Sequence, residues 1–501
     1  MDTTDTVGNE ATVRSMAVAV SLIAGLGALG LYAATVARTI TWRHGGGDGP
    51  ELSAAAAVLG IAHPTGYPLY LMLGHLFTLI PVGEVAFRVG LMSATAGAVG
   101  VACAAYLAIE LSSSFHPSDS VGRGLVPRRN AVDNDQAAGH RALPYVAARS
   151  EGRLARLAPL LGGLAGGAVL ATSPLYWSQA TIPEVYTLHA AIVLGLLTLL
   201  VAWRPGRDRL LVVTALFFGV GMGDHVTLAL LALPASVFVL VRDPGVLRRR
   251  TLAFVLMAFL LGLCVYVYLP LRAAADPPLN WGDPSNASRF FVHVTARSYQ
   301  GYLGGRPLAG VIGRASAMAQ LLIAQLTWPG LVLALLGLGE LDRGHKSLAR
   351  LLLAYVGITS AFTLIYNAEN PETYFIPAVL VLAVSLGVGV ARLASARLER
   401  WLALAALVAI PAWQVWVNLP VMDLSHDRTA ADWARQTLES APKDGVVVTQ
   451  IDDKTFALWY MQAVEHLRPD VAVVDRRLTV FDWYRTEVER RHPGALKGIT
   501  P

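Results

Sequence analysis

Long apolar runs, separated by short polar segments, dominate the chain. A helix needs about 20 apolar residues to cross the hydrocarbon core of a bilayer, and about eleven runs reach or approach that length. They lie at 15–37, 86–110, 158–177, 184–203, 210–223, 226–241, 251–271, 326–341, 349–366, 373–393 and 400–418. The two runs within 210–241 are short, but the pattern as a whole predicts an all-α protein that crosses a membrane many times.

The run YPLYLMLGHLFTLI at 67–80 is too short for a simple crossing and contains His75. Loops on the cytoplasmic side carry an excess of Lys and Arg. Basic segments occur at 111–156, 204–209, 242–250, 342–350 and 392–400. These five segments and the N-terminus can all lie on the cytoplasmic side only if the run at 67–80 does not cross the membrane. We therefore predict an interfacial helix at 67–80, an N-terminus inside and a C-terminus outside.

The chain divides into a membrane domain at 1–420 and a C-terminal part of different composition at 421–501. Within the first, 38–85 is predicted to be an extracytoplasmic loop with interfacial helices. The segment 111–156, rich in Ser, Arg, Asp and Asn, is predicted to be a flexible cytoplasmic loop. After 421, GVVVTQ and PDVAVVD are typical of strands, and KTFALWYMQAVEH and DWYRTEVERRHP of helices. Their order predicts a small extracytoplasmic α/β unit of parallel type.

Composition agrees with a membrane protein and excludes several other classes. The 501 residues are 54% hydrophobic and only 15% charged, with a mean hydropathy of +0.50, whereas soluble domains carry about 25% charged residues. The net charge of +5 comes from basic segments between spans, which indicates topology rather than a nucleic-acid surface. Cys103 and Cys264 lie in apolar runs, so neither a disulfide framework nor a cysteine metal site is predicted.

Ionisable residues are almost absent from the middles of the predicted spans and gather at their outer ends. Ion-coupled transporters usually hold such groups near the bilayer midplane. The distribution instead favours chemistry at the extracytoplasmic surface, with a lipid-linked substrate and a water-side acceptor. A lipid-linked-glycan flippase or transporter, and a non-catalytic membrane subunit whose loops bind a partner, remain as alternatives.

Two carboxylates, Asp48 and Glu51, follow the first predicted span on the Gly-rich loop GGGDGPE. One interpretation is that they cap a helix beginning at about Leu52, because acids near a helix N-terminus offset its dipole. The other is catalytic. A run of glycines allows a backbone to come close to a ligand, so Asp48 is the first catalytic candidate.

Further candidates lie in the other outer loops. His63, within AHPTGYP, either bonds locally or binds a phosphate, and Tyr67 suits the headgroup level. Glu184 begins a predicted span, where it either offsets the helix dipole or faces the surface that Asp48 shares. His225, in GMGDHVT, belongs to a tight hairpin. The hairpin is either an ordinary solvated turn or part of the site.

The segment 269–302 is the second dense polar stretch. Arg272 follows a span directly, at a depth where its guanidinium could neutralise a phosphate. Trp281 suits an interface or stacking on a sugar, whereas Asp283 could simply begin a turn before Pro284. Metal-ligand spacing, a P-loop, a nucleotide-binding Gly motif and a serine-triad signature are all absent from the sequence.

These blocks resemble a known membrane family. GGGDGPELSAAAAVLGIAHPTGYPLYLMLG followed by FRVGLMSATAG, then QATIPEVYTLHA, GVGMGDHVTLAL and DPPLNWGDP, are similar to a family once catalogued as a domain of unknown function. Its eukaryotic member is an endoplasmic-reticulum protein O-mannosyltransferase for plexin-type domains, and the family belongs to the GT-C glycosyltransferase superfamily. Departures occur at Thr65, at Gly49-Pro50 and before His225, but the carboxylates and histidines are retained.

The resemblance implies an inverting transfer of a hexose, such as mannose, from a polyprenyl phosphate to an extracytoplasmic acceptor. Asp48 would accept or orient the acceptor proton, Glu51 would support it, and donors would stabilise the departing phosphate. The implied donor-binding residues are His63, Tyr67, His225 and Arg272, and the implied substrate groove is formed by Glu184, Tyr186, Asn280, Trp281 and Asp283.

The resemblance also sets the expected partners. They are membrane lipid, the polyprenyl-phosphate sugar as a substrate rather than a cofactor, and a protein or glycan acceptor, with no nucleic acid. A divalent metal is not indicated by any residue pattern. In a bacterium the location would be the plasma membrane.

Overall fold

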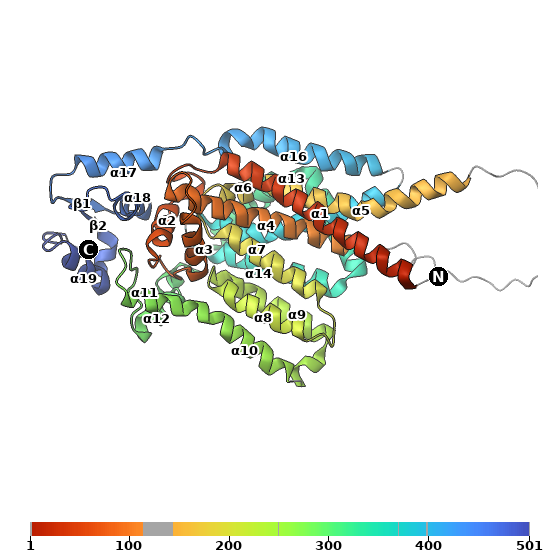
Figure 1. The fold of residues 1–501 in the computed structure, drawn as a ribbon, viewed down its shortest axis with the longest axis horizontal. Coiled ribbons are helices and arrows are strands. Elements are labelled where there is room, and N and C mark those ends of the chain that lie inside the picture. The colour runs from red at the N-terminus through yellow and green to blue at the C-terminus, as the bar shows by residue number, and fades with distance from the viewer. Residues whose placement is uncertain (1–2, 114–143, 249, 369, 397–398, 500–501) are drawn as a thin grey trace, which may run out of the picture.

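A computed structural model describes residues 3–113, 144–248, 250–368, 370–396 and 399–499. Long helices run roughly side by side along the longest axis of the molecule (Figure 1). The N-terminus lies at one end of this bundle. The C-terminal unit lies at the other end, together with the short helices α2 (Gly49–Val58), α3 (Pro68–Thr78) and α12 (Ala287–Val294). The predicted all-α membrane fold is confirmed.

Seven described helices are long and apolar enough to cross a membrane, or eight if α5 and α6, bent by 67° at Ser173, form one span. Three shorter apolar helical segments occupy the predicted runs at 184–241. The helices are α1 (Thr3–Thr35), α4 (Val85–Ser113), α5 (Pro144–Thr172), α6 (Pro174–Ala180), α7 (Tyr186–Ala202), α8 (Arg209–Met222), α9 (Ala232–Arg242), α10 (Thr251–Leu263), α11 (Tyr268–Ala274), α13 (Leu308–Gly344), α14 (Lys346–Ile365), α15 (Ile376–Ser395) and α16 (Arg400–Met422). The predicted total of about eleven spans therefore stays a prediction.

Two predicted segments differ in extent from the helices observed. The run at 326–341 is only the second part of α13, which already begins at Leu308, because polar residues interrupt its first turns. Most of the predicted flexible loop at 111–156 lies outside the described residues, and α4 and α5 extend into its two ends.

Helix α15 is the centre of the bundle and is buried along most of its length. It packs against α5 and α13 through small residues. A Cβ atom on Gly387 would lie 2.6 Å from the carbonyl oxygen of Gly162, and one on Gly389 would overlap that of Leu333. Close backbone approach through small residues is the usual way in which membrane helices associate, since lipid tails are as apolar as the side chains.

Helix α2 carries both loop carboxylates and has clear end signals. Pro50 lies in its first turn, a position where the missing amide costs no hydrogen bond. At its end Leu59 adopts a left-handed conformation, and the Gly60 amide donates to the Ala55 carbonyl at 2.7 Å. The Arg272 guanidinium donates to the carbonyl of Leu59 at 2.6 Å. Arg272 therefore braces the end of α2.

The predicted interfacial helix at 67–80 is present as α3, which packs on α2 and α4. The His75 imidazole bonds to the carbonyl of Ala56 in α2 at 2.9 Å. This contact ties the two short helices together, while the position of α3 relative to a bilayer stays a prediction.

A short backbone bridge joins the first loop to the segment after α11. The Ile61 amide donates to the Leu279 carbonyl at 2.8 Å, and the Trp281 amide donates to the Ile61 carbonyl at 3.2 Å. Gly60 precedes this bridge, and a Cβ atom there would lie 2.7 Å from the Leu279 carbonyl oxygen. Only glycine allows the two segments to come this close.

The C-terminal unit has the two predicted strands and two predicted helices in the predicted order. They are β1 (Val446–Thr449), α18 (Asp452–Ala463), β2 (Ala472–Asp475) and α19 (Asp482–Arg491). A further helix, α17 (Thr429–Ser440), precedes them and was not predicted. The strands pair in parallel, with Val446 opposite Ala472 and Thr449 opposite Asp475. The crossover helix α18 connects them, as a parallel pair requires.

The C-terminal unit shares a buried apolar cluster with the membrane part. This cluster combines Ile40, Ala54, Ala86 and Leu279 with residues of α17, α18 and β2. The Trp42 indole donates to the Asp453 carbonyl at 3.0 Å, and the Ala86 amide donates to the Tyr460 hydroxyl at 3.1 Å. Helix α18 is thereby held directly on α2.

We predict that Gly60→Ala weakens the bridge between Ile61 and Leu279. The added methyl group meets a backbone oxygen that cannot rotate away, and such overpacking costs about 1–3 kcal/mol. The detergent-solubilised variant should show a lower thermal midpoint and faster amide exchange at Ile61 and Trp281. Gly301→Ala is the control, because nothing lies within 4 Å of a Cβ atom there. Unchanged exchange in Gly60→Ala would contradict the steric explanation.

Candidate active site

Three side chains from the first loop meet at the end of the bundle near the C-terminal unit. The Glu51 carboxylate is fully buried and accepts from the His63 amide at 2.9 Å and contacts the His63 Nδ1 atom at 2.6 Å. The other imidazole nitrogen, Nε2, lies 3.8 Å from the Asp48 carboxylate. His63 is thus placed between the two acids that the sequence analysis selected.

The two carboxylates differ in access to solvent. The Asp48 side chain is 44% exposed, whereas that of Glu51 is 0% exposed. Asp48 occupies the N-cap position of α2 but makes no side-chain capping bond, and Glu51 bonds to His63 rather than to the helix end. Helix α2 also begins at Gly49 rather than near Leu52. Neither carboxylate therefore makes a side-chain capping bond, although both lie at the N-terminus of α2, where an acid offsets the helix dipole.

His63 is held as a cation by its neighbours. Burial lowers the pKa of the imidazole, but the Glu51 and Asp48 carboxylates outweigh this and raise the pKa to about 10. The imidazolium donates from Nδ1 to Glu51 and from Nε2 to the Tyr67 hydroxyl at 3.0 Å, and this hydroxyl donates to the Pro64 carbonyl at 3.3 Å. Every donor in this chain of hydrogen bonds has an acceptor.

A second group of predicted residues surrounds Tyr67. Its ring stacks near His225, with centroids 6.1 Å apart, and Tyr186 lies 5.7 Å from the same imidazole. Burial lowers the pKa of His225, so the ring is neutral. Its Nδ1 accepts from the Thr227 amide at 3.3 Å, which leaves the proton on Nε2. His225 can therefore donate one hydrogen bond to an anionic ligand without carrying charge.

Two buried acids lie close to these rings in the fold. Glu184 is 3% exposed, and its carboxylate accepts from the Val185 amide at 3.3 Å. Asp224 is fully buried next to His225, and among the described residues its carboxyl oxygens have no hydrogen-bond partner. Burial raises the pKa of Asp224 well above its usual range, so it is a neutral acid.

The segment after α11 places Trp281 next to His63. Its other candidate residues bond to other parts of the protein. Trp281 lies 6.2 Å from the His63 ring. Asp283 forms an ion pair with Arg289 and accepts from the Asn280 amide at 3.4 Å. The described hydrogen bonds of Arg272 go to α2 carbonyls. The roles of Arg272 and Asp283 towards a phosphate or sugar stay predictions.

The C-terminal unit supplies a residue of the site that the sequence analysis missed. Phe456, in α18, stacks on His63 with centroids 6.3 Å apart and an interplanar angle of 10°. Tyr299 approaches the same imidazole edge-on at 6.4 Å. Asp452 begins α18, and burial with the nearby Asp48 charge raises its pKa to about 6 although Arg477 opposes the shift. The motif KTFALWYMQAVEH predicted the helix, but no pattern within it indicated which face meets α2.

The geometry offers a half-exposed carboxylate beside a buried ion pair, with aromatic rings and neutral hydrogen-bond donors around it. No group of three or more His, Cys, Asp or Glu residues in the described part of the chain is arranged to hold a metal ion. The arrangement suits a reaction in which a carboxylate receives or orients a proton next to an apolar, water-poor surface.

Two family models match the chain. Residues 48–246 match the N-terminal domain of Protein O-mannosyl-transferase TMEM260, and residues 430–495 match TMEM260-associated domain 2. Together they cover more than half of the chain, and they include both the loop carboxylates and the helix that carries Phe456.

Two curated proteins are similar along most of the chain. Protein O-mannosyl-transferase TMEM260 of Mus musculus is 26% identical over 494 residues, which cover 90% of this chain and 62% of the mouse protein. The Dictyostelium discoideum protein of the same name is 21% identical over 503 residues, which cover 88% of this chain and 55% of that protein. The chain thus spans less than two thirds of the length of these relatives.

Solved structures of ArnT from Cupriavidus metallidurans have the same fold. The structure bound to undecaprenyl phosphate has a TM-score of 0.54 at 16% identity and covers 94% of this chain and 90% of ArnT. The apo structure also has a TM-score of 0.54, at 15% identity, and covers 95% and 91% of the two chains. The expected GT-C fold is confirmed.

We predict that Glu51→Gln sharply lowers the pKa of His63, because the larger of the two negative charges that oppose burial is then gone. In the native protein the stabilisation from His63 is fully present below about pH 6.5, the unfolded pKa, and is lost as the pH rises through the folded pKa of about 10. Nitrogen NMR of histidine-labelled protein should show a charged His63 at pH 8, and a neutral one in the variant.

The control for this experiment is Tyr67→Phe, which removes the hydroxyl at Nε2 but no charge. His63 should remain charged at pH 8 in that variant. A native His63 that titrates near pH 6 would refute the ion pair.

Proposed function

We propose a glycosyltransferase function for this chain, which belongs to the TMEM260 family of membrane proteins. The donor is a hexose, mannose in the first instance, carried on a polyprenyl phosphate, and the acceptor is a hydroxyl group of a polypeptide. The relatives' name, Protein O-mannosyl-transferase, and the undecaprenyl phosphate bound to ArnT support the two halves of this proposal.

The observation that carries the proposal is the position of Asp48. Its carboxylate is the exposed one of the two loop acids, and it lies 3.8 Å from a histidine that a buried carboxylate holds charged. An acid in this setting is fixed in place and accessible to a hydroxyl group.

In the proposed reaction, the acceptor oxygen forms a bond to the anomeric carbon of the hexose from the face opposite the phosphate. The bond between that carbon and the phosphate oxygen breaks, and its electron pair leaves with the phosphate. The hydroxyl proton passes to Asp48. The configuration at the anomeric carbon is inverted.

His63 and Glu51 act as positioning residues for Asp48 in this proposal. The imidazolium attracts the Asp48 carboxylate, and Glu51 compensates the buried positive charge. The Nε2 proton of His225 is the proposed donor to the phosphate, since an uncharged group can stabilise growing negative charge at a water-poor site. Tyr67 would act with it only if its hydroxyl exchanged the Pro64 carbonyl for the phosphate. Arg272 would join them only if it exchanged its α2 carbonyls for the phosphate.

The apolar helices supply the surface for the lipid chain. We place the reaction on the extracytoplasmic side, together with the first loop and the unit at 421–501, as the basic segments between the other spans predict. The membrane is then the plasma membrane in a bacterium. Glu184, Tyr186, Asn280, Trp281 and Asp283 remain the proposed lining of the substrate groove.

We predict that Asp48→Asn lowers hexose transfer at least 100-fold, because the amide keeps the shape but cannot take the proton, and loss of a general base costs about 10²–10⁴-fold. The assay uses purified protein in lipid nanodiscs, labelled polyprenyl-phosphate mannose and threonine-containing peptides. Donor binding and the thermal midpoint should not change.

Asp432→Asn is the matched control, since Asp432 is exposed on α17 and pairs only with Arg428 at 3.5 Å. It should transfer at the native rate. Native-like transfer by Asp48→Asn would refute the role of Asp48. Translocation of the donor lipid without any transferred product would refute the enzyme and favour a flippase.

A further inference from the structure

A cavity of about 240 Å³ lies where the segment after α11 meets the C-terminal unit. Its walls come from Pro278 to Trp281 on one side and from α18, β2 and α19 on the other. Glu51 reaches the cavity from α2, so the buried acid of the candidate active site also forms part of its wall. The cavity therefore adjoins the site without including Asp48.

Three tryptophans and a tyrosine, Trp281, Trp459, Trp483 and Tyr484, are among the residues that line the cavity. Trp281 lies 6.1 Å from Trp459 and 5.9 Å from Trp483, and Trp483 lies 5.6 Å from Tyr484. Pro278 and Pro469 complete the apolar lining. Rings in such an enclosure bind rigid apolar groups well, and proline-rich segments commonly dock in grooves lined by aromatic residues.

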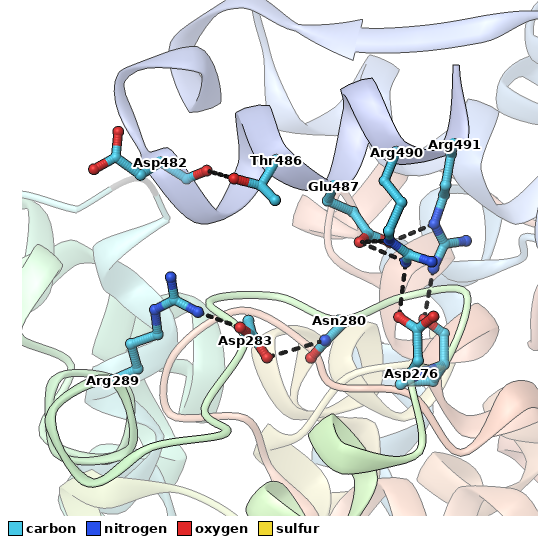
Figure 2. Close-up of polar contacts among 10 residues, drawn as sticks. Asp276, Asn280, Asp283, Arg289, Asp482, Thr486, Glu487, Arg490 and Arg491 are labelled. Carbon is cyan, nitrogen blue, oxygen red and sulfur yellow. Dashed lines mark hydrogen bonds and ion pairs between the residues drawn. The ribbon is translucent and has the colours of Figure 1, made fainter. Parts of the chain in front are cut away.

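Ion pairs close one side of the cavity. Figure 2 shows helix α19 above the segment at 276–289. Arg490 pairs with Asp276 at 2.8 Å, and Arg491 donates to the Pro277 carbonyl at 2.9 Å, while Glu487 pairs with both arginines (Figure 2). These contacts hold the two sides of the cavity at a fixed separation.

Several polar groups of the lining are already bonded within the protein, whereas the Asn280 Oδ1 atom has no hydrogen-bond partner among the described residues. Arg491 and Glu487 bind each other, and the Gln462 amide donates to the carbonyls of Arg468 at 3.0 Å and Val471 at 2.7 Å. A sugar would bring several hydroxyl groups, each costly to bury without a partner. An uncharged, mainly apolar group has few hydrogen bonds to water, so it would lose few of them on entering the cavity. The lining favours a peptide side chain over a saccharide.

Trp281 connects the cavity to the candidate active site. Its ring contacts the cavity rings and also lies 6.2 Å from His63, which is 3.8 Å from Asp48. Extended chain advances about 3.3 Å per residue, so a segment of about three residues has a length of this order. A polypeptide with its hydroxyl at Asp48 can therefore place a neighbouring side chain in the cavity.

We propose that this cavity binds a proline or aromatic side chain of the acceptor polypeptide, about three residues from the hydroxyl group that receives the sugar. The inference rests on the proposed glycosyltransferase function and adds to it a determinant of acceptor sequence. Binding in the cavity would fix the register of the acceptor, because only one hydroxyl is then within reach of Asp48.

The test compares alanine-based peptides that contain one threonine and either proline, tyrosine or alanine three positions away on either side. With the native protein, we expect a KM about tenfold lower for the proline or tyrosine peptide than for the alanine peptide, with similar kcat. Trp483→Ala should raise the lower KM to that of the alanine peptide and leave kcat unchanged.

Two further variants separate cavity binding from folding. Ala463→Leu fills the cavity instead of enlarging it and should remove the same preference. Val480→Ala is the control, because this exposed side chain precedes α19 but does not line the cavity. It should keep the native preference. Equal KM values for all peptides with the native protein would refute the proposal.

Binding is measured independently of transfer with a peptide that carries a photoreactive phenylalanine in place of the proline. We expect cross-links to the segments containing Trp459 and Trp483. Cross-links without transfer from any lipid-linked hexose would refute the proposed function but keep the cavity as a peptide site. Transfer without cross-links there, or competition by free mannose or mannobiose, would refute the peptide site.

Discussion

The contact between Glu51 and His63 is the interaction on which the structure of the candidate active site depends. One carboxylate binds both the backbone amide and the ring of the same histidine, and so fixes the chain between α2 and α3. A buried ion pair is costly if either partner is removed, because the remaining charge has no water to solvate it. The loop therefore has one arrangement, and Asp48 is presented in that arrangement only.

The sequence predicted the membrane fold and the candidate acids, because both leave local signals. Apolar runs predict helices wherever their partners lie, and a Gly-rich loop with acids at a span end predicts a surface site. It also predicted both strands and the helices α18 and α19 of the C-terminal unit from short-range patterns, but not helix α17. The short helix α3 was inferred from charges far away in the chain, and a helix is present there.

What the sequence could not predict is contact between distant segments. Phe456 and His63 are stacked, yet neither motif indicates the other. The sequence analysis predicted that Arg272 binds a phosphate. In the structure its guanidinium donates to carbonyl oxygens at the end of α2, because the left-handed Leu59 leaves carbonyls that need a donor. For Glu51 the capping and functional interpretations were equally plausible from sequence, since they differ in a side-chain direction that only the three-dimensional structure contains.

The stacking of Phe456 on His63 has a consequence for biosynthesis. The membrane helices precede α18 in the chain, so they leave the ribosome before it. Until α18 follows, the imidazole lacks its cover, and the shared apolar cluster of α2 and α18 lacks most of its members. A nascent chain consequently holds an unfinished site while its membrane helices insert, and the site becomes complete only when α18 docks on α2.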